Sequence, residues 1–410
     1  MDSQLPMKPF EYFFDPAPLG DDYTSKHLFP FLEAATREVI PGLENSNCFN
    51  PRDKGLPWPT TFPAAVQSKY WRDGQAAAVV LFEQIRSAAH SRGYELRHNG
   101  SVDEERSKRR DMLLIDTAIS APINMFPAAN ANQARILAKG NVFIFIHDGE
   151  RHIPYATSNK YLTFSLKMMS IVKTMDQLSQ GTNVLKEALE ELDSLPEELE
   201  KYQGPWKNPL FQAWVDECAQ ENFAAGLQFV QGALIWAKHT LDNPPKKQDY
   251  FSSWSDYVSF RIKDFMTVRG VSGMLQLSCN IEVPQAEREA LDEMYELYMM
   301  HFSLTNDLYS YEKEMLETKE AGVAIVNGVP VLAHLLNISR ETAKAVLRLI
   351  LIDLENKLHV VYNAHVQSGK LNDRQLRYAR SMIEGLAGNL FYSATIARYA
   401  RAVPGSHLVN

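Results

Sequence analysis

The sequence predicts an all-α protein with one large core. Nearly every patterned segment of the 410-residue chain repeats its apolar residues with the helical period, and no segment shows the alternation of paired strands. Apolar residues make up 45% of the chain, including 20 Phe, 17 Tyr and 6 Trp, enough for an extensive hydrophobic core. The clearest helical stretch is 341–358, whose apolar face consists of Ala343, Val346, Leu347, Ile350, Leu351 and Leu354.

Further helices are expected from period and capping signals. Ser339 is placed to cap the helix that contains 341–358, and Asn372 with Gln375 resembles a capping pair for a last helix over 373–403. The other expected helices span 63–92, 131–147, 160–192, 208–240, 253–279 and 285–315.

Polar and Pro-rich segments separate these helices. Residues 1–60 are rich in Pro, Asp and Asn and are expected to form an irregular N-terminal wrap, with 61–410 as a single α-helical domain. Residues 91–111 are expected to form a charged loop. The Gly-containing segment 317–330 is a candidate lid, with an ordinary loop as the alternative.

Composition excludes several classes of function. The net charge of −8 and the lack of a dominant basic stripe disfavour a nucleic-acid partner. The N-terminus lacks the pattern of a signal peptide, and no apolar run is long enough to predict a membrane span. The three dispersed cysteines, Cys48, Cys218 and Cys279, fit a reduced protein, so a cytoplasmic location is expected.

The strongest candidate for chemistry is the polar face formed by Asn306, Ser310 and Glu314. Their i, i+4, i+8 spacing puts an amide oxygen, a hydroxyl and a carboxylate in a row on one helix. Hard oxygen donors of this kind suit Mg²⁺, and Lys313 lies where it can reach a phosphate bound to such an ion. The alternative is a solvated polar stripe, but the preceding run 291–302 is too apolar for a helix that lies wholly in water.

Three weaker candidates accompany it. Asp148 and Glu150 follow the apolar run 135–146 and are placed to meet a metal ion across a pocket, although Asp-Gly is also an ordinary turn pair. Arg261, with Asp264 one turn later, can hold a phosphate or form a simple ion pair. Arg398 and Tyr399 offer a guanidinium and a phenol near the C-terminus, where a surface pair is the alternative.

Together and in this order, the four motifs resemble the class I terpene synthase family, in particular its fungal members, over about residues 126–402. Asn306, Ser310 and Glu314 match the second metal motif, including the Asp after Asn306 and the Lys before Glu314. The resemblance implies roles for the other residues: Arg261, 45 residues before Asn306, as the diphosphate sensor, Asp264 as linker, Phe265 as effector, and Arg398 with Tyr399 as a diphosphate grip.

The first metal motif departs from the family pattern. Two adjacent aspartates usually begin it, whereas this chain has His147-Asp148-Gly149-Glu150, so His147 or Gly149 replaces one of them, depending on the register. Asp148 is the expected ligand on this side, with Glu150 a weaker one. The resemblance implies a helical bundle around a central apolar cavity, three Mg²⁺ ions, a linear prenyl diphosphate as the substrate and a possible homodimer.

The resemblance implies ionisation of the substrate to an allylic carbocation, which requires a closed apolar pocket because water would quench the cation. Farnesyl diphosphate and a sesquiterpene product, as in fungal secondary metabolism, are the expected substrate and product. Alternatives are a diterpene or sesterterpene cyclase, a prenyl-transferring enzyme, and a non-catalytic helical interaction protein derived from the family. Aromatic side chains that can face the cation are expected to line the pocket: Phe143, Phe145, Tyr257, Phe260, Phe302, Phe391 and Tyr392.

Overall fold

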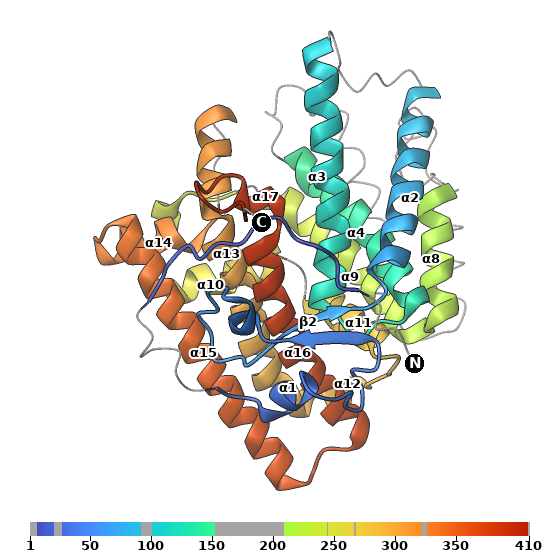
Figure 1. The fold of residues 1–410 in the computed structure, drawn as a ribbon, viewed down its shortest axis with the longest axis vertical. Coiled ribbons are helices and arrows are strands. Elements are labelled where there is room, and N and C mark those ends of the chain that lie inside the picture. The colour runs from blue at the N-terminus through green and yellow to red at the C-terminus, as the bar shows by residue number, and fades with distance from the viewer. Residues whose placement is uncertain are drawn as a thin grey trace.

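A computed structural model describes residues 6–19, 27–91, 101–151, 209–243, 245–265, 268–321 and 326–408. Almost all of the secondary structure is helical, as the sequence predicts (Figure 1). The longer helices are α2 (Trp71–Ser91), α3 (Ser101–Met125), α4 (Ala131–Arg151), α8 (Pro209–Glu221), α9 (Phe223–Asp242), α10 (Trp254–Phe265), α11 (Val268–Ser278), α13 (Asp292–Ala321), α14 (Gly328–Leu336), α15 (Arg340–Ser368) and α16 (Asp373–Thr395). Short elements complete the order: α1 (Pro30–Ala35), β1 (Ser46–Phe49), η2 (Pro51–Lys54), β2 (Ala65–Ser68), η5 (Gln248–Tyr250), α12 (Gln285–Arg288), η6 (Glu289–Leu291) and α17 (Ala397–Ala400).

The helices form two adjoining groups (Figure 1). In one group α4 packs on α2, α3 and α8, and α8 and α11 pack on α9. In the other group α13 packs on α10, α14, α15, α16 and α17. Contact between α16 and α3 joins the two groups, and a Cβ on Gly388 would collide with the Asn124 carbonyl, so the glycine permits this approach. Within the described residues, no helix is long and apolar enough to cross a membrane.

Local signals in the sequence set several helix ends. Ser339 Oγ accepts a hydrogen bond from Thr342 N at the start of α15, and Asn372 and Gln375 form a reciprocal capping box at the start of α16. Both caps were predicted and are confirmed. The predicted apolar face of α15 is buried at Ala343, Leu347, Leu351 and Leu354 and partly buried at Val346 and Ile350.

Four expectations about helices are corrected. The expected charged loop 91–111 becomes helical from residue 101, because α3 carries its charged N-terminal half into an apolar C-terminal half. The expected helix 208–240 is two helices, since Asn222 leaves the helical conformation and caps α9. The expected helix 63–92 starts only at Trp71. The expected last helix over 373–403 ends at Thr395, and the chain turns at Ile396 before α17. The expected helix 160–192 lies outside the described residues.

A small sheet also corrects the expectation that no strands pair. Strands β1 and β2 pair antiparallel, with Ser46 opposite Ser68 and Phe49 opposite Ala65. The sheet lies against α16 (Figure 1) and ties the N-terminal region to residues beyond the expected boundary at 60. The N-terminal segment continues this contact, since Phe14 N donates to Ala394 O and Phe13 N to Ser406 O. The division into a wrap at 1–60 and a domain at 61–410 stays a prediction.

Candidate active site

The centre of α13 carries the predicted metal motif on a face turned toward α10, α14 and α17. Ser310 is buried, and Asn306 and Glu314 are partly buried. Residues 291–302, the apolar run before the motif, contribute Leu291, Met294, Tyr298, Met299 and Phe302 to the core. The motif is therefore held in an ordered, mostly buried helix and does not form a solvated stripe.

Arg261 of α10 is joined to this motif by two strong contacts. Its Nε donates to Asp307 Oδ1 at 2.7 Å, and its Nη2 donates to Asn306 Oδ1 at 2.8 Å. Asp264, one turn away, accepts from Arg261 Nη1 at 3.3 Å. Because Arg261 is 5% exposed and Asp307 is fully buried, the guanidinium is fixed between two helices in a region from which water is excluded.

Asp307 is the acceptor that organises this network. Besides Arg261, its carboxylate accepts from the Tyr257 hydroxyl and, at 3.1 Å, from the Gly328 backbone N–H. Burial raises the pKa of Asp307, and Arg261 and Tyr257 offset part of that rise. Burial, the largest single effect, would lower the pKa of Arg261, but Asp307, Tyr257 and Asp264 together outweigh it, so the pKa lies above its ordinary value and the group stays a cation.

Tyr399 extends the network to the C-terminus. Its hydroxyl accepts a hydrogen bond from Asn306 Nδ2 at 2.7 Å, so both ends of the Asn306 amide are engaged. Its neighbour Arg398 places its guanidinium over the ring of Phe145 on α4, 5.6 Å from the ring centre. Residues from α4, α10, α13 and α17 therefore converge on one region.

Ser310 and Glu314 form the second part of the motif. Ser310 Oγ donates to Glu314 Oε1 at 2.7 Å, and Asn327 Nδ2 donates to Glu314 Oε2 at 3.0 Å. Burial raises the pKa of Glu314, and the nearby Lys313, Arg261 and Ser310 offset part of the rise. A partly buried carboxylate whose hydrogen bonds come from neutral donors is stabilised by a cation, so the donor set fits a hard metal ion. Among the described residues no cluster of His, Cys, Asp and Glu offers an alternative metal site.

The other predicted residues of this region lie close by. The Phe265 ring lies under the Arg261 guanidinium, 5.1 Å from its carbon, and packs edge-to-face on Phe302 at 5.3 Å. The Asp264 backbone carbonyl accepts from Trp236 Nε1 at 2.8 Å, which anchors the end of α10. Lys313 Nζ lies 2.8 Å from Glu317 Oε2, one turn further along α13.

The predicted first metal motif lies at the C-terminal end of α4, away from the motif on α13 along the chain. His147, Asp148, Gly149 and Glu150 are helical, but their side chains lie outside the described residues. Phe145 is one turn before Asp148 on the same helix, and Arg398 covers its ring. The backbone therefore places this motif beside α17, and the roles of Asp148 and Glu150 stay predictions.

The predicted pocket aromatics separate into two sets. Tyr257, Phe302 and Tyr392 are buried near the network, with Tyr392 packed edge-to-face on Tyr399 at 6.0 Å. Phe143 and Phe391 instead pack on aromatic neighbours elsewhere, which are Phe211 with Trp214 and Phe10 with Phe49, respectively. Phe260 packs on Phe251, which in turn contacts Tyr257. The assignment of Phe143, Phe260 and Phe391 to a substrate pocket stays a prediction.

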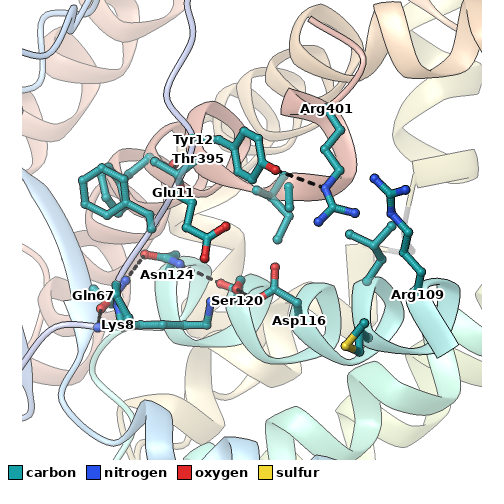
Figure 2. Close-up of a pocket in the computed structure, with 17 residues that line it drawn as sticks. Lys8, Glu11, Tyr12, Gln67, Arg109, Asp116, Ser120, Asn124, Thr395 and Arg401 are labelled. Carbon is teal, nitrogen blue, oxygen red and sulfur yellow. Dashed lines mark hydrogen bonds and ion pairs between the residues drawn. The ribbon is translucent and has the colours of Figure 1, made fainter. Parts of the chain in front are cut away.

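A separate pocket lies at the seam between the N-terminal segment, α3 and the α16–α17 junction (Figure 2). It has a volume of about 240 Å³, and its lining includes Lys8, whose Nζ donates to Asp116 Oδ1 at 2.6 Å. The Arg109 and Arg401 side chains extend toward it from two helical elements (Figure 2). Of the predicted site residues only Phe391 lines it, so it is distinct from the converging network.

Two residues of the network were not assigned a role from the sequence. The sequence pattern marks Asp307 only as part of the motif, although its place directly after Asn306 turns it to a different helix face, toward Arg261 of α10. Asn327 lay within the candidate lid. Of that segment, Glu317–Ala321 ends α13, residues 322–325 are outside the described part, and Asn327 caps α14. An N-cap signal before the apolar run 328–336 could have found it.

Comparisons with known proteins agree with this geometry. A family model described as terpene synthase family 2, C-terminal metal binding, matches residues 168–357, which include Arg261 and the whole Asn306 motif. The chain is 28% identical to terpene cyclase aneC of Aspergillus aculeatus over 91% of this chain and 77% of that protein. It is 24% identical to terpene cyclase 6 of Gibberella fujikuroi over 97% of this chain and 96% of that protein.

The fold of the chain is similar to that of solved terpene synthase structures. Aristolochene synthase from Penicillium roqueforti superposes with a TM-score of 0.54 at 14% identity, covering 77% of this chain and 94% of that structure. These similarities support the fungal class I terpene synthase family as the one this chain resembles. The same similarities support a terpene synthase enzyme, and the matched metal-binding model implies a prenyl diphosphate as the class of substrate and the use of a divalent metal.

Proposed function

We propose that this terpene synthase is a Mg²⁺-dependent cyclase that ionises farnesyl diphosphate, cyclises the carbocation to a sesquiterpene and releases diphosphate. The observation that carries the proposal is the chain of contacts from Arg261 through Asn306 to Tyr399, at 2.8 and 2.7 Å. It joins the predicted sensor, the metal motif and the C-terminal diphosphate grip, which are far apart in sequence. A surface ion pair or a solvated stripe would not produce this convergence.

Asn306, Ser310 and Glu314 would hold Mg²⁺ on the α13 side, and Asp148 with Glu150 would do so from α4, for a proposed total of three ions. Bound Mg²⁺ supplies the positive charge that turns diphosphate into a leaving group. Arg261, Lys313 and Arg398 add fixed positive charges around the same group, and Tyr399 adds a hydroxyl donor. Their attraction to diphosphate grows as the C–O bond breaks, because negative charge then accumulates on the departing oxygen.

Arg261 is prepared for this role by what already holds it. Its Nε is fixed by Asp307, whereas Nη2 is held by the neutral amide oxygen of Asn306. Exchanging an amide for a phosphate oxygen strengthens the hydrogen bond, since the new acceptor is charged. When Arg261 exchanges its acceptor, its guanidinium would shift. Phe265 follows Asp264 and its ring contacts Arg261, so as the effector it would transmit that shift to the hydrocarbon end of the substrate.

The hydrocarbon part of the substrate requires an apolar, closed environment, because water would capture the cation. Tyr257, Phe302 and Tyr392 are the buried aromatics near the network that best fit a cavity wall. Each aromatic face can stabilise a cation by about 0.5–2 kcal/mol. The released diphosphate is a suitable base for the final proton loss.

The length of the substrate is inferred from the sequence. The given 410 residues contain no second aspartate-rich pair of the kind that chain-elongating prenyltransferases carry, and no Asp-x-Asp-Asp motif for protonation-initiated cyclisation. Farnesyl diphosphate follows as the proposed substrate. Geranylgeranyl diphosphate or a longer homologue is the second candidate, because relatives include a bifunctional diterpene synthase of Aspergillus flavipes, 29% identical over 40% of this chain.

Incubation of the purified protein with each diphosphate in Mg²⁺ tests the proposal. Gas chromatography of the extract should show a cyclic C15 hydrocarbon from farnesyl diphosphate, and none when the metal is chelated. If a cyclic product formed from geranylgeranyl diphosphate and not from farnesyl diphosphate, the proposed substrate would be wrong and the longer diphosphate would take its place. Absence of a hydrocarbon from either would favour the interaction protein, and a requirement for an acceptor would favour a prenyl-transferring enzyme. Size-exclusion chromatography would test the proposed homodimer.

A further inference from the structure

Asn327 is a buried side chain whose every hydrogen-bonding group is used. It is 1% exposed and stands directly before α14. Its Oδ1 accepts from Val329 N at 2.9 Å, which caps the helix. Its Nδ2 donates to the Asp307 backbone carbonyl at 2.7 Å and to Glu314 Oε2 at 3.0 Å. One side chain therefore connects the start of α14 to two positions on the motif helix.

These contacts orient the Glu314 carboxylate. Ser310 Oγ holds Oε1 at 2.7 Å and Asn327 Nδ2 holds Oε2 at 3.0 Å, so rotation of the carboxylate about its terminal bond is restricted. Both donors are neutral, so the charge of Glu314 is not cancelled. Each carboxylate oxygen also has a second lone pair, which is free to meet a cation. An arginine in the place of Asn327 would compete with that cation instead.

The second contact of Nδ2 keeps Asn327 itself in position. The Asp307 carbonyl lies on the backbone of α13, and the Asp307 carboxylate takes the next backbone N–H, of Gly328, at 3.1 Å. The first residues of α14 are thus attached to α13 at both the backbone and the side chain of Asp307. The donor to Glu314 is therefore presented by a rigid support, as ligand-orienting groups around metal ions are.

We infer that Asn327 is a positioning residue for the metal site, which orients Glu314 toward Mg²⁺ and fixes the start of α14 to the motif helix. The inference rests on the proposed function, because it takes Glu314 as a metal ligand. It adds a residue outside the metal motifs, the sensor and the C-terminal Arg-Tyr pair.

Replacement of the amide while the cap is retained separates the two roles of Asn327. Asn327→Ser keeps a side chain that caps helices well and removes the donor to Glu314, and Asn327→Gly, also accepted at N-caps, is a second variant. Isothermal titration calorimetry of Mg²⁺ into each protein with inorganic diphosphate measures metal affinity without turnover. Loss of a group that orients a metal ligand typically costs about 10- to 100-fold in affinity, and that loss is expected for both variants.

Ser339→Ala is the matched control, since it removes the cap of the next helix, α15, far from Glu314 along the chain. It should lower the unfolding temperature and leave Mg²⁺ affinity unchanged. Wild-type Mg²⁺ affinity in both Asn327 variants, with the affinity lost in Glu314→Ala, would overturn the role of Asn327 and leave the metal site intact. Wild-type affinity in Glu314→Ala would overturn the proposed metal site and this inference together.

Discussion

Helix α13 takes part in two buried charged clusters that differ in how completely their carboxylates are satisfied. In the first, Glu355 of α15 is 2% exposed and accepts from the hydroxyls of Thr60 and Thr61, the Thr61 N–H and the His301 ring. In the second, the hydrogen-bond donors to the Glu314 carboxylate within the described part of the chain are the Ser310 hydroxyl and the Asn327 amide. Both clusters contain a negative charge away from bulk water, but only in the first do protein donors satisfy both oxygens of the carboxylate with several hydrogen bonds.

The pKa directions express this difference. Burial acts to raise the pKa of Glu355, yet His301 and the two threonines outweigh it, so its pKa lies below the ordinary value. Burial raises the pKa of Glu314, and its neighbours offset that only in part. The pKa of Glu314 stays raised despite its hydrogen bonds and nearby cationic side chains, so its ionised form is still unfavourable. A bound cation would stabilise that ionised form. Incomplete satisfaction, and not burial alone, therefore distinguishes a candidate metal ligand from a structural anchor.

The largest effect is expected at the closed cluster. Glu355→Ala leaves His301 and two threonine hydroxyls buried without their acceptor, and the free energy of unfolding should fall by about 3–5 kcal/mol. Urea denaturation measures this loss. Glu355→Gln keeps the shape and should lose less. A stability change within error for Glu355→Ala would mean that this cluster does not anchor the N-terminal region.

Replacements in the metal motif should mainly reduce turnover, whereas the loss of Glu355 mainly reduces stability. Asn306→Ala and Glu314→Ala remove proposed metal ligands and should lower kcat/KM by about 10²- to 10³-fold, the loss typical for one preorganised electrostatic group. Stability should fall less than in Glu355→Ala, by about 1–3 kcal/mol, because Arg261 Nη2 or Asn327 Nδ2 loses one acceptor. Steady-state release of diphosphate from farnesyl diphosphate is the measurement. Retained turnover in both variants would contradict the metal assignment.

Asp307 links structure and catalysis, so its replacement should affect both. Asp307→Asn keeps the shape but removes the charge that holds Arg261 Nε, and kcat/KM should fall by about 10- to 100-fold. Stability should fall by about 1–3 kcal/mol, because a hydrogen-bonded charge is lost from a buried network. Kinetics and urea denaturation of the same preparation report both effects. A loss of stability with unchanged kinetics would restrict Asp307 to a structural role.

The smallest effect is a pH dependence of stability that belongs to Glu355. Its folded-state pKa lies below the unfolded value of about 4.5, so its contribution is fully present above that pH. The contribution is lost as the pH falls through the folded-state pKa. Urea midpoints of the wild type and Glu355→Gln should therefore differ at neutral pH and converge in acid. A constant difference across this range would contradict the assignment.

The sequence predicted the helical class and the parts of the site that lie on one helix. Asn306, Ser310 and Glu314 share a face because their spacing follows the helical period, and the caps at Ser339 and Asn372 depend only on residues within one turn. The pairing of β1 with β2 depends on contacts between distant segments, which no local pattern encodes. The capping role of Asn327 is readable locally, but its contact with Glu314 on α13 is not. The roles assigned to Asp148 and Glu150 stay predictions.

Thermal unfolding with and without Mg²⁺ and inorganic diphosphate tests the central claim, that the charged cluster around Asn306 and Glu314 is completed by a bound cation. Ligands that bind only the folded state stabilise it. The unfolding temperature of the wild type should rise when both are added, and that of Glu314→Ala should rise far less. An unchanged temperature for the wild type at saturating concentrations, or an equal rise in Glu314→Ala, would contradict the account.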